Sequence, residues 1–259
     1  MNRCKVCGGS LTDIGGGNFR CTCCRAMFSA SDFSAKPKKS ISEQKESVSV
    51  SGADVFDNNV GGVLEISWTH GNSEYSGSGL IITSDGYAIT NTHVVSFADG
   101  RSCGSVTVKV CDENIKADVI RLGDDRHGAG NGVDLALIKL RRMPADAKAL
   151  TFADSEKVRN GENVYVIGNS LGYGTCITSG IVSDRARSNG GKVYVMHDCA
   201  TNGGNSGGPL FNAQGYVIGV HVSSQLNNGA LAVGMKYAIP SRTVWEFIKK
   251  CGVNIGRLI

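Results

Sequence analysis

A serine within a run of glycines is the first place where this sequence suggests chemistry. Ser206 lies in the segment 202–210, which is Asn-Gly-Gly-Asn-Ser-Gly-Gly-Pro-Leu. A serine hydroxyl is a weak nucleophile until a base takes its proton and backbone donors stabilise the oxyanion that forms. Glycines let the chain turn tightly and bring its N–H groups close to a substrate carbonyl. The segment therefore predicts a nucleophile loop with its own oxyanion hole.

A histidine and an aspartate lie upstream in contexts that suit such a nucleophile. His93 follows two short strand-like runs, 80–83 and 87–90, joined by the turn signal Ser-Asp-Gly. Asp134 opens an apolar run that ends at Leu140, where a charge is costly without a partner. An imidazole is such a partner, and a histidine held by an aspartate is the base that a serine nucleophile needs.

Each of these residues also has an inert interpretation: a strand-capping aspartate, a surface histidine and a turn serine. All three together, in these contexts, favour the catalytic interpretation. Structural roles are preferred for the other histidines, His70, His127, His197 and His221.

Seven sequence blocks in this order resemble trypsin-fold serine proteases of the HtrA (DegP) type, in the chymotrypsin-like superfamily. The blocks are 77–82, 90–95, 134–140, 161–168, 178–183, the serine loop and 237–241. By this resemblance His93 is the base, Asp134 orients it, and Ser206 is the nucleophile. The resemblance also assigns the oxyanion hole to the backbone N–H groups of Gly204 and Ser206, and a wall of the specificity pocket to the strand of His221.

The resemblance further indicates how a substrate is bound. Ala200, six residues before the nucleophile, takes the place of the pocket base, so a lysine or arginine side chain would lie there without a charge partner. A small or medium apolar residue on the acyl side of the cut is expected. The segment Val222, Ser223 and Ser224 is expected to pair with the substrate backbone as an added strand. Asn205 replaces the aspartate that captures a new N-terminus in digestive enzymes, which disfavours activation by clipping.

Four cysteines near the N-terminus predict a structural zinc site. Cys4, Cys7, Cys21 and Cys24 form two Cys-x-x-Cys pairs separated by thirteen residues, a spacing typical of a four-thiolate zinc ribbon. Cys23 is an alternative ligand to Cys24, and disulfides or a redox pair are the alternatives to zinc. Zn²⁺ is the only cofactor expected, and none is expected in catalysis.

The remaining cysteines are scattered and interpreted as ordinary buried or half-buried residues: Cys103, Cys111, Cys176, Cys199 and Cys251. Cys199 lies next to Ala200, so a reactive thiol there would make the site sensitive to oxidants.

Composition limits the location and the partners. No apolar leader precedes Cys4 and no run approaches the roughly 20 apolar residues of a membrane helix, so we expect a cytoplasmic protein without a membrane partner. Residues 1–50 carry the whole net charge of +4, or about +2 once four thiolates and one Zn²⁺ are included. Strong phosphate binders show a denser basic patch, so nucleic acid is disfavoured as a partner. The expected partners are a protein or peptide substrate and a protein bound through the zinc ribbon.

The patterns predict three parts: a zinc ribbon over 1–30, a flexible linker over 31–54, and a protease domain over 55–259 without a PDZ domain. The domain is expected to be all-β, with two six-stranded antiparallel barrels and a closing helix over 241–250 that Ser241 caps. The predicted strands are 63–68, 80–83, 87–90, 106–110, 115–122, 135–140, 163–167, 175–182, 193–198, 209–212, 217–222 and 234–238. We expect a serine endopeptidase that acts through an acyl-enzyme. The alternative is an interaction protein in which the protease domain is latent or a scaffold.

Overall fold

The computed structural model describes residue 3 and residues 10–30, 50–124, 132–227 and 230–259. These fall into two compact units, Met1–Ser49 and Val50–Ile259, each of which is described by itself. Most of the predicted linker, His127, Cys4 and Cys7 lie outside the described residues.

The first unit contains a small antiparallel sheet of β1 (Leu11–Gly15), β2 (Asn18–Cys21) and β3 (Met27–Ser29), in that order. Phe19 and Phe28 are register partners on β2 and β3, and both are half-buried. Cys21, the last residue of β2, is 1% exposed. So small a sheet has few apolar side chains to bury, which is why such a piece usually needs a metal or a disulfide.

The second unit begins with α1 (Gly52–Asp57), whose first turn carries a capping box between Ser51 and Asp54. The helix lies partly within the segment predicted to be linker. The first barrel follows, after the short 3₁₀ helix η2 (Val60–Gly62). Its strands are β4 (Val63–His70), β5 (Ser73–Ile81), β6 (Tyr87–Thr90), β7 (Ser105–Val110), β8 (Glu113–Leu122) and β9 (Ala136–Leu140). They pair in the order β4-β5-β6-β9-β8-β7, and β7 returns to β4 and closes the sheet.

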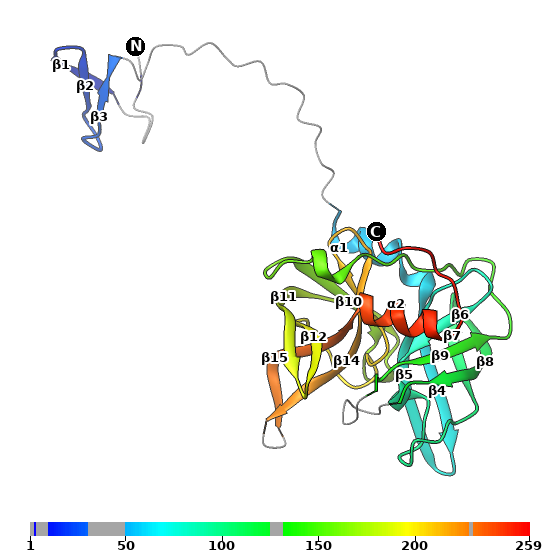
Figure 1. Ribbon diagram of the computed structural model, residues 1–259. Coiled ribbons are helices and arrows are strands. Elements are labelled where there is room, and N and C mark those ends of the chain that lie inside the picture. The colour runs from blue at the N-terminus through cyan, green and yellow to red at the C-terminus, as the bar shows by residue number, and fades with distance from the viewer. Residues whose placement is uncertain (1–2, 4–9, 31–49, 125–131, 228–229) are drawn as a thin grey trace. The chain divides into compact units, whose positions relative to one another are not determined.

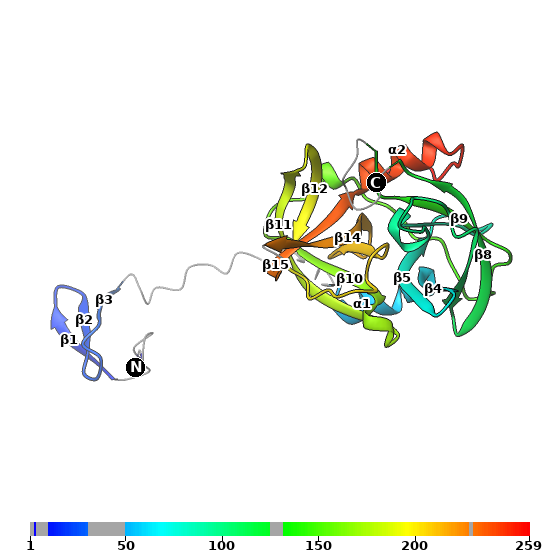
Figure 2. The ribbon, with the colours of Figure 1, turned by 90° about the horizontal axis from the view of Figure 1, so that it is seen from below.

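A second set of six strands follows a crossover that contains the 3₁₀ helix η4 (Ser155–Lys157). Its members are β10 (Asn163–Asn169), β11 (Thr175–Asn189), β12 (Lys192–His197), β13 (Pro209–Asn212), β14 (Val217–Asn227) and β15 (Ala230–Pro240). They pair in the order β10-β11-β12-β15-β14-β13, and β13 pairs with β10. Figures 1 and 2 show this set beside the first barrel, with α2 (Ser241–Lys250) packed along their shared side.

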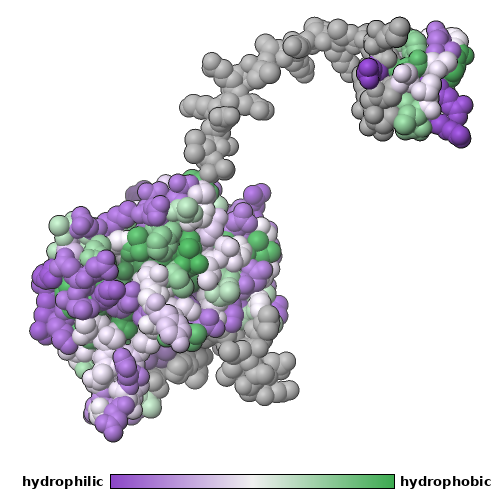
Figure 3. All heavy atoms as spheres, turned by 180° about the vertical axis from the view of Figure 1, so that it is seen from behind, coloured by the Kyte–Doolittle hydropathy of each residue, from purple (hydrophilic) through white to green (hydrophobic). Residues whose placement is uncertain are grey.

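The apolar core joins these parts. One cluster of buried side chains takes members from the first barrel (Leu80), the second (Ile167, Phe211) and α2 (Val244), while two further clusters fill the barrels themselves. Each fully buried side chain of this size contributes about 1.5–3 kcal/mol. On the face seen in Figure 3, hydrophilic side chains surround a central apolar area of the second unit. Among the described residues, no helix is long and apolar enough to cross a membrane.

The predicted all-β class with a closing helix is confirmed, and several details differ. β14 ends at Asn227 and β15 begins at Ala230, so both are longer than predicted. β5 begins at Ser73 and β11 continues to Asn189, because both strands extend as hairpins beyond their apolar stretches. Ser241 does not cap α2: the N-cap is Pro240, and the Ser241 hydroxyl donates to the carbonyl of Ala153 at 2.6 Å. A buried serine predicted to cap a helix instead fixes the crossover to it.

Candidate active site

His93 lies in a short 3₁₀ turn, η3 (Thr92–Val94), that follows β6. The residues before it are fastened to the segment that directly precedes β9. Asn91 Nδ2 donates to the carbonyl of Asp134 at 2.7 Å, and Thr92 Oγ1 donates to the carbonyl of Leu135 at 2.7 Å. These bonds hold the histidine next to the aspartate from the other strand.

The His93 and Asp134 side chains form a close pair. Nδ1 of His93 lies 2.6 Å from Oδ2 of Asp134, and the backbone N–H of His93 donates to Oδ1 at 3.1 Å. The Asp134 side chain is 2% exposed and that of His93 14%. Because the carboxylate accepts from Nδ1, the proton of the neutral imidazole is placed on Nδ1, and Nε2 is left as the basic nitrogen.

Ser206 lies in the loop between β12 and β13, and this loop packs against the segment that carries His93. A side-chain carbon on Gly207 would lie 2.3 Å from Thr90 Oγ1 and 3.0 Å from the Asn91 nitrogen. Ser206 Oγ donates to the carbonyl of Val222 on β14 at 3.1 Å. The structure thus brings the loop of the predicted nucleophile to the turn that holds the predicted base.

Two glycines of this loop, Gly204 and Gly207, are required by close approaches. Gly204 and Gly207 have φ of +92° and +86°, which side chains rarely adopt. A Cβ would lie 2.1 Å from the Asn169 carbonyl oxygen at Gly204 and 2.2 Å from the Ser78 carbonyl oxygen at Gly207. Glycine at these two positions of the nucleophile loop therefore has a steric cause.

The backbone N–H groups of Gly204 and Ser206 are both available. The carbonyl of Gly203 accepts from Leu171 N–H at 2.7 Å, so the N–H of Gly204, on the other side of that trans peptide, points the opposite way. Neither the Gly204 nor the Ser206 N–H donates to another of the described residues. Two unpaired N–H groups beside a serine are what an oxyanion hole requires.

The predicted substrate-binding residues lie on two sides of Ser206. Ala200 is exposed and precedes the nucleophile loop. Val222, Ser223 and Ser224 lie on β14, which pairs with β15 as far as Asn227 but with β13 only as far as Val220. Beyond Val220 the other edge of β14 is therefore not paired with β13.

Two buried histidines form a second pair that the sequence did not reveal. His197 Nε2 lies 3.3 Å from His221 Nδ1, and the residues are 0% and 2% exposed. Burial lowers the pKa of His197 from 6.5 to about 4, and burial, followed by the neighbouring His197, lowers the pKa of His221 well below 6.5. The two residues pair with Lys236 and Ala238 on the intervening β15, so only the strand register places them together.

Burial also decides the state of Cys199. Its side chain is 0% exposed and burial raises its pKa to about 12, so the oxidant-sensitive thiol considered from the sequence is not supported. Cys176, in contrast, is exposed, which corrects its interpretation as at least half-buried.

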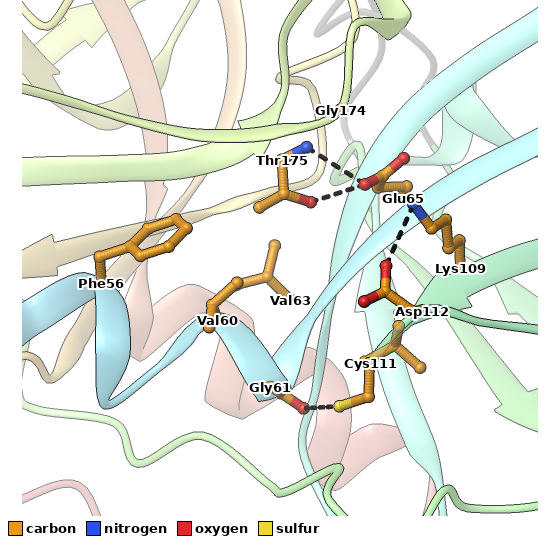
Figure 4. A pocket seen from close by; sticks show the side chains of 11 residues that line it. Phe56, Val60, Gly61, Val63, Glu65, Lys109, Cys111, Asp112, Gly174 and Thr175 are labelled. Carbon is orange, nitrogen blue, oxygen red and sulfur yellow. Dashed lines mark hydrogen bonds and ion pairs between the residues drawn. The ribbon is translucent and has the colours of Figure 1, made fainter.

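A cavity of about 380 Å³ lies away from the predicted catalytic residues, against α1, η2 and the β7–β8 turn. Glu65 Oε1 in its wall accepts from Thr175 N–H at 3.1 Å and from Thr175 Oγ1 at 2.9 Å (Figure 4). The contact fastens the loop before β11 to the first barrel. None of the residues predicted to act in catalysis lines this cavity.

The predicted zinc ligands are described only in part. Cys21 is buried, Cys23 and Cys24 are exposed, and Cys23 N–H donates to the Cys21 sulfur at 3.4 Å. Within the described ranges, no three His, Cys, Asp or Glu side chains are gathered as a metal site. An N–H group directed at a cysteine sulfur suits a thiolate ligand, and the four-thiolate site remains a prediction.

Comparisons with known proteins agree with this geometry. Residues 77–220, which are 144 of the 259, match the model of the trypsin-like peptidase domain family. A probable periplasmic serine endoprotease, DegP-like, from Brucella suis is 40% identical over 187 residues, covering 70% of this chain and 34% of that protein. A probable periplasmic serine protease, do/HhoA-like, from Haemophilus influenzae is 38% identical over 181 residues, or 67% of this chain and 36% of that protein.

Solved structures give the same result. The HtrA-type protease AlgW with a tripeptide has a TM-score of 0.66 and 27% identity, covering 77% of this chain and 63% of that one. The decapeptide complex of AlgW has a TM-score of 0.64 and 26% identity, covering 78% and 67%.

The relatives also correct one prediction and set a limit. They are described as periplasmic, so the cytoplasmic location predicted from the sequence is wrong by this comparison. The chain spans about a third of the length of these curated relatives. By its family match, its barrels and its similarity to these proteins, the chain belongs to the trypsin-like peptidase family, where its relatives are serine proteases of the HtrA and DegP-like type.

Proposed function

We propose that this chain is a serine endopeptidase of the HtrA type, with Ser206 as nucleophile, His93 as base and Asp134 as the residue that orients the base. The observation that carries the proposal is the His93–Asp134 pair, 2.6 Å apart, beside a glycine loop whose Gly204 and Ser206 N–H groups are unpaired. A buried carboxylate on one ring nitrogen keeps the other nitrogen basic.

The reaction follows from these groups. His93 Nε2 takes the Ser206 hydroxyl proton as Oγ attacks the substrate carbonyl, and the Gly204 and Ser206 N–H groups bind the resulting oxyanion. When the tetrahedral intermediate collapses, the amide C–N bond breaks and the imidazolium gives its proton to the leaving amine. Water then attacks the acyl-enzyme with His93 again as base, which releases the acid and restores Ser206.

The substrate is proposed to be an extended polypeptide that pairs with β14 along Val222, Ser223 and Ser224. Support comes from the edge of β14, which is not paired with β13 beyond Val220. A small or medium apolar side chain on the acyl side is proposed, because Ala200 offers no charge to a basic one.

The N-terminal sheet is proposed to be a zinc ribbon held by Cys4, Cys7, Cys21 and Cys24, used for targeting or assembly. The burial of Cys21 and the N–H directed at its sulfur support it. Metal analysis of protein purified without chelator tests it: we expect about one zinc per chain, reduced in Cys21→Ser. A zinc content well under one per chain would reject the ribbon.

A fluorophosphonate probe tests the endopeptidase. Wild type should be labelled and should cleave fluorescent casein, an unfolded protein, whereas Ser206→Ala should do neither. Ser76→Ala serves as the matched control, because it removes an exposed hydroxyl from β5 and should behave as wild type.

The alternative is a protease domain that is latent or a scaffold, with the N-terminal zinc ribbon as the part that binds a partner. It is favoured by the Ser206 hydroxyl, which donates to the Val222 carbonyl in this structure. Failure of wild type both to react with the probe and to cleave casein would support this alternative and overturn the endopeptidase.

A further inference from the structure

Ser78 connects the first barrel to both residues of the proposed oxyanion hole. It lies on β5 and is 0% exposed. Its N–H donates to the carbonyl of Ser206 at 2.8 Å, and its hydroxyl donates to the carbonyl of Gly204 at 2.7 Å. One residue outside the nucleophile loop thus holds the carbonyls of the two residues whose N–H groups are unpaired.

The Ser78 hydroxyl also fixes the neighbouring loop. Its oxygen accepts from the backbone N–H of Asn169 at 2.8 Å, at the end of β10. Two residues later, Leu171 N–H holds the carbonyl of Gly203 at 2.7 Å. The peptides on both sides of Gly204 are therefore fixed, one by Ser78 directly and one by the loop that Ser78 anchors.

Gly204 has particular need of such support. Its φ of +92° is accessible to glycine, and glycine has the greatest backbone freedom of any residue. Rotation of the Gly203–Gly204 peptide would direct the Gly204 N–H away from a bound oxyanion. Because catalytic donors must be fixed before the charge develops, loss of this restraint should reduce transition-state stabilisation.

Ser78 is itself fastened from the catalytic side. Its carbonyl accepts from Thr90 Oγ1 at 2.7 Å, and Thr90 ends β6 directly before the turn that carries His93. The residue thus joins the strand leading to the base, the nucleophile and the oxyanion N–H groups.

We propose that Ser78 is a positioning residue: its hydroxyl holds the Gly204 N–H in the arrangement that binds the oxyanion, while its backbone N–H restrains Ser206. The proposal rests on the endopeptidase function proposed above. Ser78 does not touch the substrate; it acts through the two carbonyls and the Asn169 N–H.

The test is the Ser78→Ala variant of the full chain, which removes the hydroxyl contacts to the Gly204 carbonyl and the Asn169 N–H but keeps the backbone N–H that binds the Ser206 carbonyl. It is assayed with a quenched peptide copied from the main casein cleavage site. We expect kcat to fall about tenfold to a hundredfold, since loss of a complete oxyanion donor costs 10²–10³, while KM changes less than about twofold. The affinity of a peptide aldehyde, which adds to Ser206 Oγ and places its oxygen at the two N–H groups, should fall in parallel. The same peptide should bind Ser206→Ala and Ser78→Ala/Ser206→Ala equally well.

Ser76→Ala is the matched control, two residues earlier on β5 and exposed. If Ser78→Ala does not fold, Ser78→Cys carries the test, because a thiol of similar size is a weak donor and should give a smaller loss of kcat. If a folded Ser78→Ala variant keeps the kcat and the aldehyde affinity of the wild type, the role of Ser78 is overturned and the endopeptidase proposal is not affected. An inactive wild type would overturn the endopeptidase and this proposal together.

Discussion

The second unit contains two histidine pairs that differ in partner and in burial. His93 lies 2.6 Å from the carboxylate of Asp134 and keeps some exposure, whereas His197 lies 3.3 Å from another imidazole, that of His221, in the interior. A carboxylate partner favours the imidazolium that forms during acyl transfer. An apolar site with a second imidazole disfavours any added proton. The second pair is thus held where an added proton is disfavoured, whereas the first pair places a carboxylate beside the imidazole.

The comparison shows that position on the strands, more than residue type, separates a reactive histidine from a structural one. His93 follows the end of β6 in a turn, where solvent and a substrate can reach it. His197 and His221 point inward from β12 and β14, and His197 Nδ1 has no hydrogen-bond partner among the described residues. The structural interpretation of these two histidines agrees with this burial.

The largest effect on activity is expected when the His93–Asp134 pair loses the charge of its carboxylate. Asp134→Asn should lower kcat about ten thousandfold near neutral pH, because an amide no longer selects the tautomer with a basic Nε2. Peptide hydrolysis measures it, with circular dichroism to show that the fold is kept. Asp118→Asn, in an exposed ion pair with Arg141, is the control and should retain wild-type activity. If kcat falls less than tenfold in Asp134→Asn, the carboxylate does not distinguish the His93–Asp134 pair from the buried His197–His221 pair.

A smaller effect is expected on stability when the second pair is titrated. Below pH 6.5 the unfolded chain binds protons on these histidines, while folded His197 resists protonation until about pH 4. The unfolded state then holds more protons, so the free energy of unfolding should decrease as the pH is lowered from about 6.5 to about 4. The slope is at most about 1.4 kcal/mol per pH unit for each histidine. Urea unfolding of Ser206→Ala from pH 7.5 to 4.5 measures it without self-digestion.

Exposed carboxylates also titrate near the acid end, so a variant is needed to attribute this slope. His197→Phe keeps a ring in the interior and removes one ionisable group. The pH slope should decrease by up to about 1.4 kcal/mol per pH unit, while kcat changes little at pH 7.5. His70→Gln, at an exposed position, should leave the slope as in wild type. An unchanged slope in His197→Phe would show that the buried pair does not avoid protonation.

The contrast also explains what could be predicted from the sequence. The strands followed from short β-branched and apolar runs between turn signals. His93, Asp134 and Ser206 were singled out by local signals (a turn, a charge entering an apolar run and a glycine loop), and the resemblance to HtrA-type proteases supplied their predicted roles. Ser78 and the His197–His221 pair gave no such signal, because their roles depend on contacts between strands far apart in sequence.

The predicted N-terminal zinc ribbon shows a different limit of prediction from the sequence. A cytoplasmic, reducing location would keep the thiols free to bind zinc, and the periplasmic relatives remove that support. Spacing and the N–H contact to Cys21 are what remain. The predicted location was wrong because it was inferred from the absence of an apolar leader and of a long apolar run, and an absence does not identify a compartment.

The smallest effect on activity is expected when thiols are alkylated, which tests whether water is excluded from the interior near the His197–His221 pair. Cys199, two residues after His197, is fully buried with a pKa raised to about 12, so the reactive thiolate is not formed near neutral pH. Iodoacetamide should alkylate exposed Cys176 in the folded protein and Cys199 only after unfolding, as peptide mass mapping would show, and peptidase activity should be retained. Alkylation of Cys199 in the folded state, with a loss of activity that Cys199→Ser prevents, would mean that the interior beside the histidine pair opens. The low pKa of His197 would then have no cause, since the same exclusion of water keeps the imidazole neutral and the thiol protonated.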